Sequence, residues 1–249
     1  MNLLDNSFYN QYATSLTVDL EQAVKVFSET KFDFGFRMQA SSVWSSNIEG
    51  NSLSLNSYMN IKMRTLVSQN KEVKEIDDLV DAYNFAKDSP LTEAAFISAH
   101  KLLARNLLIK LKQGVSRTEL AGMAGENSLD YQPAEPARIA GLMSRLFAEI
   151  GDLLGRELKV GEVFYYAAFM HLRLAHILPF TDGNGRAARL LEKWFLARKL
   201  GIQYWNLQVE KQYKDHQQEY YDHLKLGPNF EELDYSKAVP FLQMLPNSF

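Results

Sequence analysis

Apolar residues recur at intervals of three and four through most of the chain. A clear example follows Pro136, where the apolar positions run from Ile139 to Ile150. This period places apolar side chains on one face of a helix, and proline suits the first helical turn. The same pattern predicts helices near residues 17–29, 36–49, 56–68, 72–87, 92–110, 159–177, 185–200 and 207–226. The fold is therefore predicted to be mainly α.

Three segments depart from the amphipathic pattern. Residues 163–177 are apolar nearly all round, which is typical of a helix buried at the centre of a fold. Residues 113–133 carry several glycines and a proline between short apolar pieces, which indicates turns and a short β-hairpin. Beyond residue 227 the pattern indicates an irregular tail with room for one short helix.

The loop after the central helix combines an acid, two glycines, an amide and two arginines. It reads Leu-Pro-Phe-Thr-Asp-Gly-Asn-Gly-Arg-Ala-Ala-Arg over residues 178–189. Gly183 and Gly185 let the backbone approach a ligand, and the helix that follows attracts anions to its unpaired amides. Arg186 and Arg189 lie three apart on that helix and point the same way. The loop is therefore predicted to hold a polyphosphate.

Asp182 is a hard oxygen ligand beside the predicted phosphates. Such a carboxylate suits Mg²⁺, which completes its shell with phosphate oxygens and water. We therefore expect Asp182 to hold the metal. The alternative is an ordinary polar turn, because Asp-Gly and Asn-Gly are common turn dipeptides, but the flanking Pro-Phe and Arg-x-x-Arg favour a binding loop.

This loop resembles the motif of the Fic family, proteins that move AMP from ATP onto hydroxyl side chains of target proteins. The family pattern is His-Pro-Phe-x-Asp/Glu-Gly-Asn-Gly-Arg-x-x-Arg, and every specified position from Pro179 to Arg189 fits. The family's histidine, the base that takes the proton from the target hydroxyl, falls on Leu178. Leucine cannot accept a proton, so the resemblance implies binding of ATP and Mg²⁺ with transfer lost or residual. The nucleotide-binding residues that it implies are Gly183, Asn184, Gly185, Arg186 and Arg189.

A second stretch, from Ser45 to Gly50, resembles the inhibitory motif of the Fic subgroup that carries its own inhibitory helix upstream, here about residues 36–49. In that subgroup the glutamate reaches the second arginine of the loop and blocks the position of the ATP γ-phosphate. The resemblance therefore implies autoinhibition by an ion pair between Glu49 and Arg189, with Ser45 in the same motif.

Weaker matches extend the resemblance to roughly residues 36–226. Gly114 to Arg117 resembles the family's Gly-x-x-Arg turn, and the segment from Tyr131 to Pro133 resembles the end of the flap that docks the target chain. The resemblance implies a Fic-type helical bundle with a short β-hairpin flap at 113–133 that binds a target protein. The implied parts are N-terminal helices over 1–90, a Fic core over 91–226 and a tail over 227–249, together one compact unit.

Other polar residues have simpler interpretations. His171 and His176 lie five apart, which does not stack two metal ligands as a spacing of four would. His176 is an alternative base for transfer, although its side chain should leave the helix in a different direction from residue 178. Tyr220 and Tyr221 match aromatic positions near the adenine in the family, although core residues would look the same. The acidic residues Glu72, Glu75, Asp77, Asp78 and Asp81 are most simply one solvated helix face.

Composition limits the binding partners and the cellular compartment that the sequence predicts. The chain has 249 residues, an apolar fraction of 46%, a formal net charge of −3 and no cysteine. Its length and apolar fraction support one well-buried domain, and its charge gives no reason to expect nucleic-acid binding. Neither a signal peptide nor an apolar run of membrane-spanning length is visible, and the lack of cysteine fits a reducing compartment. The sequence predicts a soluble cytoplasmic protein and leaves the oligomeric state open, a homodimer included.

Three functions stay open at this point. The leading hypothesis is an autoinhibited, Fic-like ATP-binding protein that acts through a partner. The second is an enzyme, either an active AMP transferase or a hydrolase that removes AMP, in which Glu49 orients a water before a metal-held phosphate. The third is a nucleotide-independent interaction module whose flap at 113–133 pairs with a partner's strand.

Overall fold

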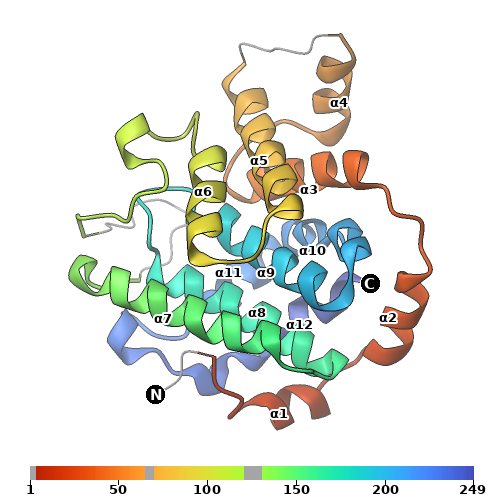
Figure 1. Cartoon of the computed structure of the whole chain (residues 1–249), viewed down its shortest axis with the longest axis vertical. Helices are drawn as coiled ribbons and strands as arrows, with labels where there is room; N and C mark the ends of the chain where they lie inside the picture. Colours follow the sequence, from red (N-terminus) through yellow and green to blue (C-terminus); the bar gives the residue numbers. More distant parts are fainter. Residues whose placement is uncertain (1–3, 65–69, 121–130) are drawn as a thin grey trace.

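The computed structural model of the chain describes residues 4–64, 70–120 and 131–249. In these ranges the structure is helical, with two isolated β-bridges and no extended strand, so the predicted mainly α fold is confirmed. The α-helices are α1 (Tyr9–Thr14), α2 (Leu20–Ser28), α3 (Phe34–Ile48), α4 (Leu55–Arg64), α5 (Lys71–Asp88), α6 (Glu93–Leu103), α7 (Pro136–Gly155), α8 (Val160–Ile177), α9 (Asn184–Leu200), α10 (Val209–Asp215), α11 (Gln217–Leu224) and α12 (Val239–Met244) (Figure 1). The short 3₁₀ turns are η1 (Lys110–Lys112), η2 (Ile202–Asn206), η3 (Phe230–Glu232), η4 (Tyr235–Lys237) and η5 (Pro246–Ser248).

Side-chain caps fix where several helices begin. Asp19 accepts a hydrogen bond from the backbone N–H of Gln22 at the start of α2. Thr92 accepts one from the N–H of Ala95 at the start of α6. Each cap satisfies an amide that the first helical turn leaves unpaired. Pro136 occupies the first turn of α7, in agreement with the sequence pattern.

The helix predicted over 92–110 is too long, because α6 ends at Leu103. Just beyond that end, the backbone N–H and the side-chain amide of Asn106 donate to the carboxylate of Asp78 at 2.8 and 2.7 Å. These two bonds to α5 turn the chain away from the axis of α6. The spacing of apolar residues cannot predict these hydrogen bonds, since Asp78 lies far away in the sequence.

The single helix predicted over 207–226 is also wrong, because the structure divides it into α10 and α11 at His216. The backbone of His216 has φ −114° and ψ 40°, outside the helical region. Its Nδ1 lies 3.1 Å from the carbonyl oxygen of Gln212. After this break, α10 packs against α3 and α11 packs against α12.

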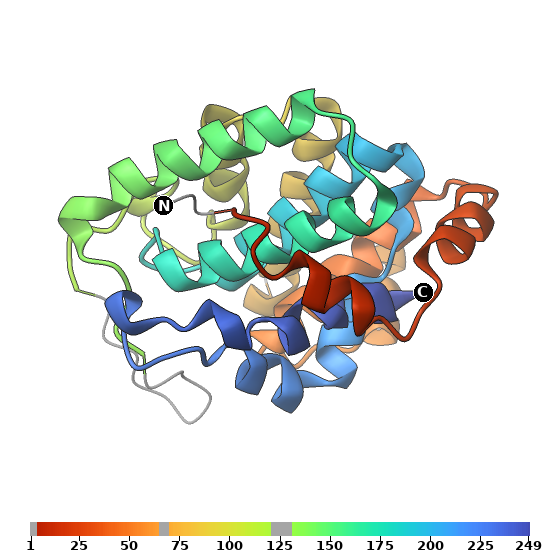
Figure 2. The same cartoon turned by 90° about the horizontal axis from the view of Figure 1, so that it is seen from below.

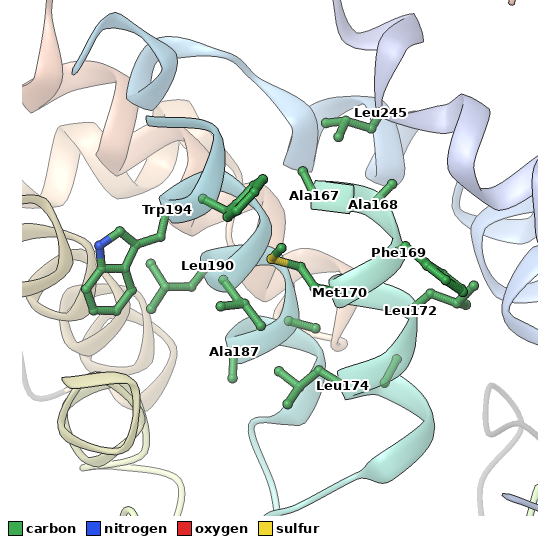
Figure 3. Close-up of a cluster of buried hydrophobic side chains, with 14 of the residues drawn as sticks. Ala167, Ala168, Phe169, Met170, Leu172, Leu174, Ala187, Leu190, Trp194 and Leu245 are labelled. Atoms are coloured by element: carbon green, nitrogen blue, oxygen red, sulfur yellow. The ribbon is translucent and has the colours of Figure 1, made fainter. Parts of the chain in front are cut away.

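α8 and α9 share the most extensive helix–helix contact of the fold. Every residue of α8 from Val163 to Ile177 is buried, which confirms the predicted central helix. Figure 3 shows Met170 between the two helices, with Leu190 and Trp194 on the α9 side. All three side chains are fully buried, so this contact forms the centre of the hydrophobic core.

The remaining helices surround this pair. α7 and α12 pack against α8 from opposite sides, with α1 and α2 beside them (Figure 2). α3 and α5 lie against α9. In the described part of the chain, no helix is both long and apolar enough to cross a membrane.

The hairpin predicted within 113–133 falls partly on residues 121–130, which lie outside the described residues. On either side of them, single β-bridges join Ser116 to Phe180 and Gln132 to Asn229. The first bridge places residue 116 directly beside the loop that follows α8.

The prediction of a solvated acidic face on α5 is wrong for two of its members. Asp78 is 2% exposed and Glu75 is 9% exposed. Burial raises the pKa of Asp78, and the hydrogen bonds from Asn106 compensate the buried oxygen. Glu75 lies 4.0 Å from the guanidinium of Arg186 on α9. Both carboxylates have partners that are distant in sequence, and a charge pattern does not show such partners.

Replacing Leu190 with alanine should lower the free energy of unfolding by about 2–5 kcal/mol, because it opens a cavity between α8 and α9. Urea unfolding followed by circular dichroism measures this loss. The matched control is Met63→Ala, since Met63 is 79% exposed on α4, and its effect should stay within about 0.5 kcal/mol. Equal effects of the two changes would contradict the placement of the core.

Candidate functional site

The loop after α8 begins with a strained residue. Leu178 has φ 47° and ψ 64°, and it is the only non-glycine residue with positive φ among the described residues. For a residue with a Cβ atom this left-handed conformation costs roughly 1–2 kcal/mol. Such strain persists only where the surroundings hold it. Arg117 contacts this residue directly, and His100 and Asn184 hold the rest of the loop.

Arg117 holds the end of α8 from outside the loop. Its buried guanidinium donates to the carbonyl oxygens of Ile177 at 3.3 Å and of Leu178 at 2.7 Å. Both carbonyls belong to the end of a helix, where no backbone partner follows. The backbone N–H of Arg117 donates to the oxygen of Pro179 at 2.9 Å. Arg117 therefore fixes the start of the loop, a role that the sequence pattern did not indicate.

His100 of α6 supports the middle of the loop. Its ring stacks on Phe180, with 3.5 Å between the ring centroids. Nδ1 accepts a hydrogen bond from the N–H of Gly114 at 3.1 Å, so Nε2 carries the proton and donates to the carbonyl of Asp182 at 2.9 Å. Burial lowers the pKa of His100 to about 4, and the ring is neutral at physiological pH. The sequence does not indicate this role of His100, since no local motif marks it.

Asn184 closes the loop on itself. Its Oδ1 accepts from the N–H of Phe180 at 2.9 Å, and its Nδ2 donates to the Phe180 carbonyl at 2.8 Å. Both polar atoms of this side chain therefore shape the loop. Gly183 has φ 82°, and a Cβ atom there would meet Leu103 at 2.8 Å, so glycine is required at this position.

Asp182 lies exposed at the tip of the loop, where its Oδ1 accepts from the N–H of Gly183 at 2.6 Å. Among the described residues, no group of three or more His, Cys, Asp or Glu could hold a metal ion. An open carboxylate of this kind fits Mg²⁺ that keeps most of its shell in phosphate oxygens and water. It does not fit a metal held by protein ligands alone.

Glu49, directly after α3, lies over the N-terminus of α9. Its Oε1 is 2.7 Å from Nη2 of Arg189, so the expected ion pair is present. A Cβ atom on Gly185 would stand 2.3 Å from the same oxygen. The carboxylate thus occupies the space beside the first turn of α9, where unpaired amides and the helix dipole favour an anion. One anionic group of the protein already lies where the sequence predicts a phosphate.

Arg189 makes three further hydrogen bonds. Nε donates to the hydroxyl of Ser45 at 2.8 Å, Nη2 to the Ser45 carbonyl at 3.0 Å, and Nη1 to the hydroxyl of Tyr220 at 3.2 Å. Ser45 and Glu49 are four residues apart and therefore meet the same guanidinium. Tyr221 donates to the carbonyl oxygen of Ile48 at 2.8 Å, which ties α11 to the end of α3.

The charges at this site keep Glu49 ionised. Burial alone would raise the pKa of Glu49, but the guanidinium groups of Arg189 and Arg186 outweigh burial and hold that pKa below 4.5. Arg186 is 4% exposed, and its Nε has no hydrogen-bond partner among the described residues. A buried guanidinium with an unused donor is suited to a further anion.

His176 does not replace the missing base. Its Nδ1 lies 2.9 Å from the hydroxyl of Tyr235, and its Nε2 lies 2.8 Å from the carbonyl of Leu224. Burial lowers the pKa of His176 to about 4. Both nitrogens face α11 and the C-terminal segment, so the alternative in which His176 takes the target's proton is wrong.

The comparison with protein families agrees with this geometry. Residues 90–196 match the sequence model of the Fic/DOC family, a range that runs from the start of α6 into α9. Residues 90–196 therefore correspond to a Fic/DOC family domain.

Related sequences bear a specific name. "Protein adenylyltransferase Fic" of Culex quinquefasciatus is 28% identical over 188 residues, which are 72% of this chain and 35% of that protein. The protein of the same name from Aedes aegypti is 44% identical over 62 residues, 25% of this chain and 11% of that protein. The matched part of this chain thus corresponds to about a third or less of each relative.

Solved structures show the same fold. A crystal structure of a Fic family protein from Desulfovibrio desulfuricans G20 superposes with a TM-score of 0.70 at 24% identity, covering 96% of this chain and 69% of that one. Fic-1 from C. elegans superposes with a TM-score of 0.68 at 19% identity, covering 97% of this chain and 69% of that one. At these identities the likeness establishes the helical fold.

The ion pair predicts a pH-dependent stability difference between the native protein and Glu49→Gln. The folded-state pKa of Glu49 lies below its ordinary value of 4.5, so the carboxylate stabilises the fold above that pH. The contribution is lost as the pH falls through the folded-state pKa. Urea unfolding from about pH 7 down to about pH 3 should therefore show the difference shrinking in acid.

Ser45→Ala is the matched control, because the Ser45 hydroxyl contacts the same guanidinium without titrating. Its effect on the free energy of unfolding should not follow the same pH curve. A Glu49→Gln difference that stays constant across the range would contradict the ion pair.

Proposed function

We propose that the chain is an ATP-binding protein of the adenylyltransferase type, held in an autoinhibited state by Glu49. The observation that carries the proposal is the Glu49 carboxylate, which lies on Arg189 and against Gly185 at the N-terminus of α9. A carboxylate occupies this position because the site attracts anions. The names of the sequence relatives from Culex and Aedes support ATP as the ligand and a protein as the acceptor.

The residues present fit a nucleotide polyphosphate with Mg²⁺. Arg186 offers a buried guanidinium with an unused Nε, and Arg189 becomes available once Glu49 withdraws. Gly185 keeps the first turn of α9 open to a phosphate oxygen. Asp182 would hold Mg²⁺, which neutralises phosphate charge when bound. Asn184, His100 and Arg117 keep the loop in shape around these groups.

Transfer of AMP should be weak or absent because residue 178 is leucine. Losing a general base typically lowers the rate by roughly 10²- to 10⁴-fold. Phosphate binding should not depend on residue 178, since the groups proposed to bind the phosphates belong to α9 and the loop backbone. His100 and His176 each have both ring nitrogens hydrogen-bonded. We infer regulated nucleotide binding that acts through a partner.

The target protein would dock at the flap over 113–133. Support for this position comes from the bridge between Ser116 and Phe180, which joins the described start of that segment to the loop. The cytoplasmic location, a homodimer and the division of the chain at residues 90 and 227 stay predictions from the sequence.

One observation weighs against the hydrolytic alternative. A general base works best when its pKa lies near the operating pH. The guanidinium groups of Arg189 and Arg186 hold the pKa of Glu49 below 4.5, which makes its carboxylate a poor proton acceptor. Removal of AMP with Glu49 as the base is therefore the weaker proposal.

Calorimetric titration with Mg-ATP tests the proposal. Glu49→Gly should bind ATP more tightly than the native chain, because no carboxylate has to be displaced. In that background Arg186→Ala should weaken binding by about 10- to 100-fold, since it removes a charge-assisted hydrogen bond. Arg198→Ala, an exposed arginine near the far end of α9, is the matched control and should change little.

Two results would overturn nucleotide binding at this site. One is equal affinity for Mg-ATP of the Glu49→Gly protein and of the same protein with Arg186→Ala. The other is no heat even with Glu49→Gly, which would favour the nucleotide-independent interaction module.

A further inference from the structure

The chain around the end of α6 exposes several aliphatic side chains. Ile109 is 65% exposed, Leu111 83% and Val115 49%, and Ile97 on α6 itself is 36% exposed. In Figure 1 this part of the chain, yellow to yellow-green, stands out to the side of the helices. Single exposed apolar residues are normal, but several on one short segment mark an interaction surface.

These side chains belong to one segment that is held against α6. Gly114 has φ 68°, and a Cβ atom there would meet the Ile97 carbonyl at 2.9 Å and the Lys101 Cβ at 3.2 Å. The turn therefore packs closely against α6. The side chain of Gln113 donates to the carbonyl oxygens of Arg105 at 3.0 Å and of Leu108 at 2.8 Å, which closes the turn around η1. A surface held in this way loses little conformational entropy on binding.

The same segment carries positive charge. Residues 97–120 contain five basic residues and one acidic residue, whereas the whole chain has a formal net charge of −3. Arg105 is paired with Asp78 and Asp81, and Arg117 is buried, so the exposed positive charge comes from the three lysines. Lys101 and Lys110 form no ion pair with the described residues, and Nζ of Lys112 lies 3.6 Å from the carboxylate of Glu119. Lysine alternates with exposed aliphatic residues from Ile109 to Lys112. The surface is therefore complementary to a segment that is both apolar and acidic.

A pocket of about 320 Å³ opens beside these residues. Its lining residues are Phe85, Ser98, Lys101, Leu102, Arg105 and Gln113. Phe85 and Leu102 supply apolar surface, and Lys101 brings positive charge to the same pocket, whereas Arg105 is already paired with Asp78 and Asp81. A hollow of this kind accepts a single apolar side chain, with an acidic neighbour next to the cations.

This surface is directly connected to the candidate site. The backbone of Arg117 bonds to Pro179, and Ser116 forms a β-bridge with Phe180. His100 of the same helix, α6, supports the carbonyl of Asp182. A chain that docks on the segment therefore lies next to the loop that would hold the nucleotide.

We propose that the basic apolar face, defined as Ile97, Lys101, Ile109, Lys110, Leu111 and Val115, docks an acidic segment of the target protein with an apolar side chain in its centre. The inference rests on the proposed function, because it assigns the chemistry by which that site recruits its target. Nucleic acid is the less suitable occupant, since the exposed apolar residues of the face are aliphatic and offer no ring on which bases could stack.

Selection from a random peptide library displayed on phage tests the proposal with the full chain and without nucleotide. Recovered peptides should carry an apolar residue flanked by Asp or Glu. Fluorescence anisotropy of these labelled peptides should show about tenfold or greater loss of affinity for Ile109→Ser with Leu111→Ser, and for Lys110→Glu. The matched controls are Met63→Ser on α4 and Lys25→Glu on α2, both exposed, and these should bind as the native chain does.

Several outcomes would overturn the proposal. They are recovery of no peptide, recovery of peptides without the acidic and apolar pattern, and undiminished binding to the variants while circular dichroism shows them folded. Binding of a single-stranded DNA oligonucleotide that the same variants abolish, without peptide binding, would assign the face to nucleic acid instead. Arg186→Ala should bind the peptides normally, so a failure of nucleotide binding is distinguishable from a failure of docking.

Discussion

The ion pair between Glu49 and Arg189 is the interaction on which the site depends. Arg189 is 1% exposed within α9, and a charge so deeply buried is costly unless it is paired. Ser45 and Tyr220 satisfy its other donors, and Glu49 neutralises its charge. The same contacts attach the end of α3 to the start of α9. A nucleotide phosphate at this position would have to take over the role of the Glu49 carboxylate, so nucleotide binding and the position of Glu49 are coupled.

The loop owes its shape to three side chains, two from other parts of the chain and one from the loop's own end. Arg117 holds the carbonyls at the end of α8, His100 supports Phe180 and Asp182, and Asn184 closes the turn. None of these contacts uses the side chain of residue 178, although the backbone there keeps a strained left-handed conformation. Leucine at that position is therefore compatible with this loop shape, although it cannot accept a proton.

Much of this arrangement follows from the sequence, and the rest depends on contacts between distant residues. The apolar period predicted the central helix α8, and the glycines and arginines of the loop predicted an anion site. The pairing of Asn106 with Asp78 ended α6 early, and His216 divided one predicted helix in two. The burial of Glu75 and the support from His100 could not be predicted, because no local pattern shows which distant side chain will lie opposite.

The most direct test of the account is intact-mass analysis of the Glu49→Gly protein incubated with Mg-ATP, beside Glu49→Gly combined with Leu178→His. If the proposed nucleotide site is sound, is closed by Glu49 and lacks its base, the protein should gain AMP only when histidine stands at position 178. Equal gain of AMP with Leu178 in place would contradict it, because another group would then have to accept the proton.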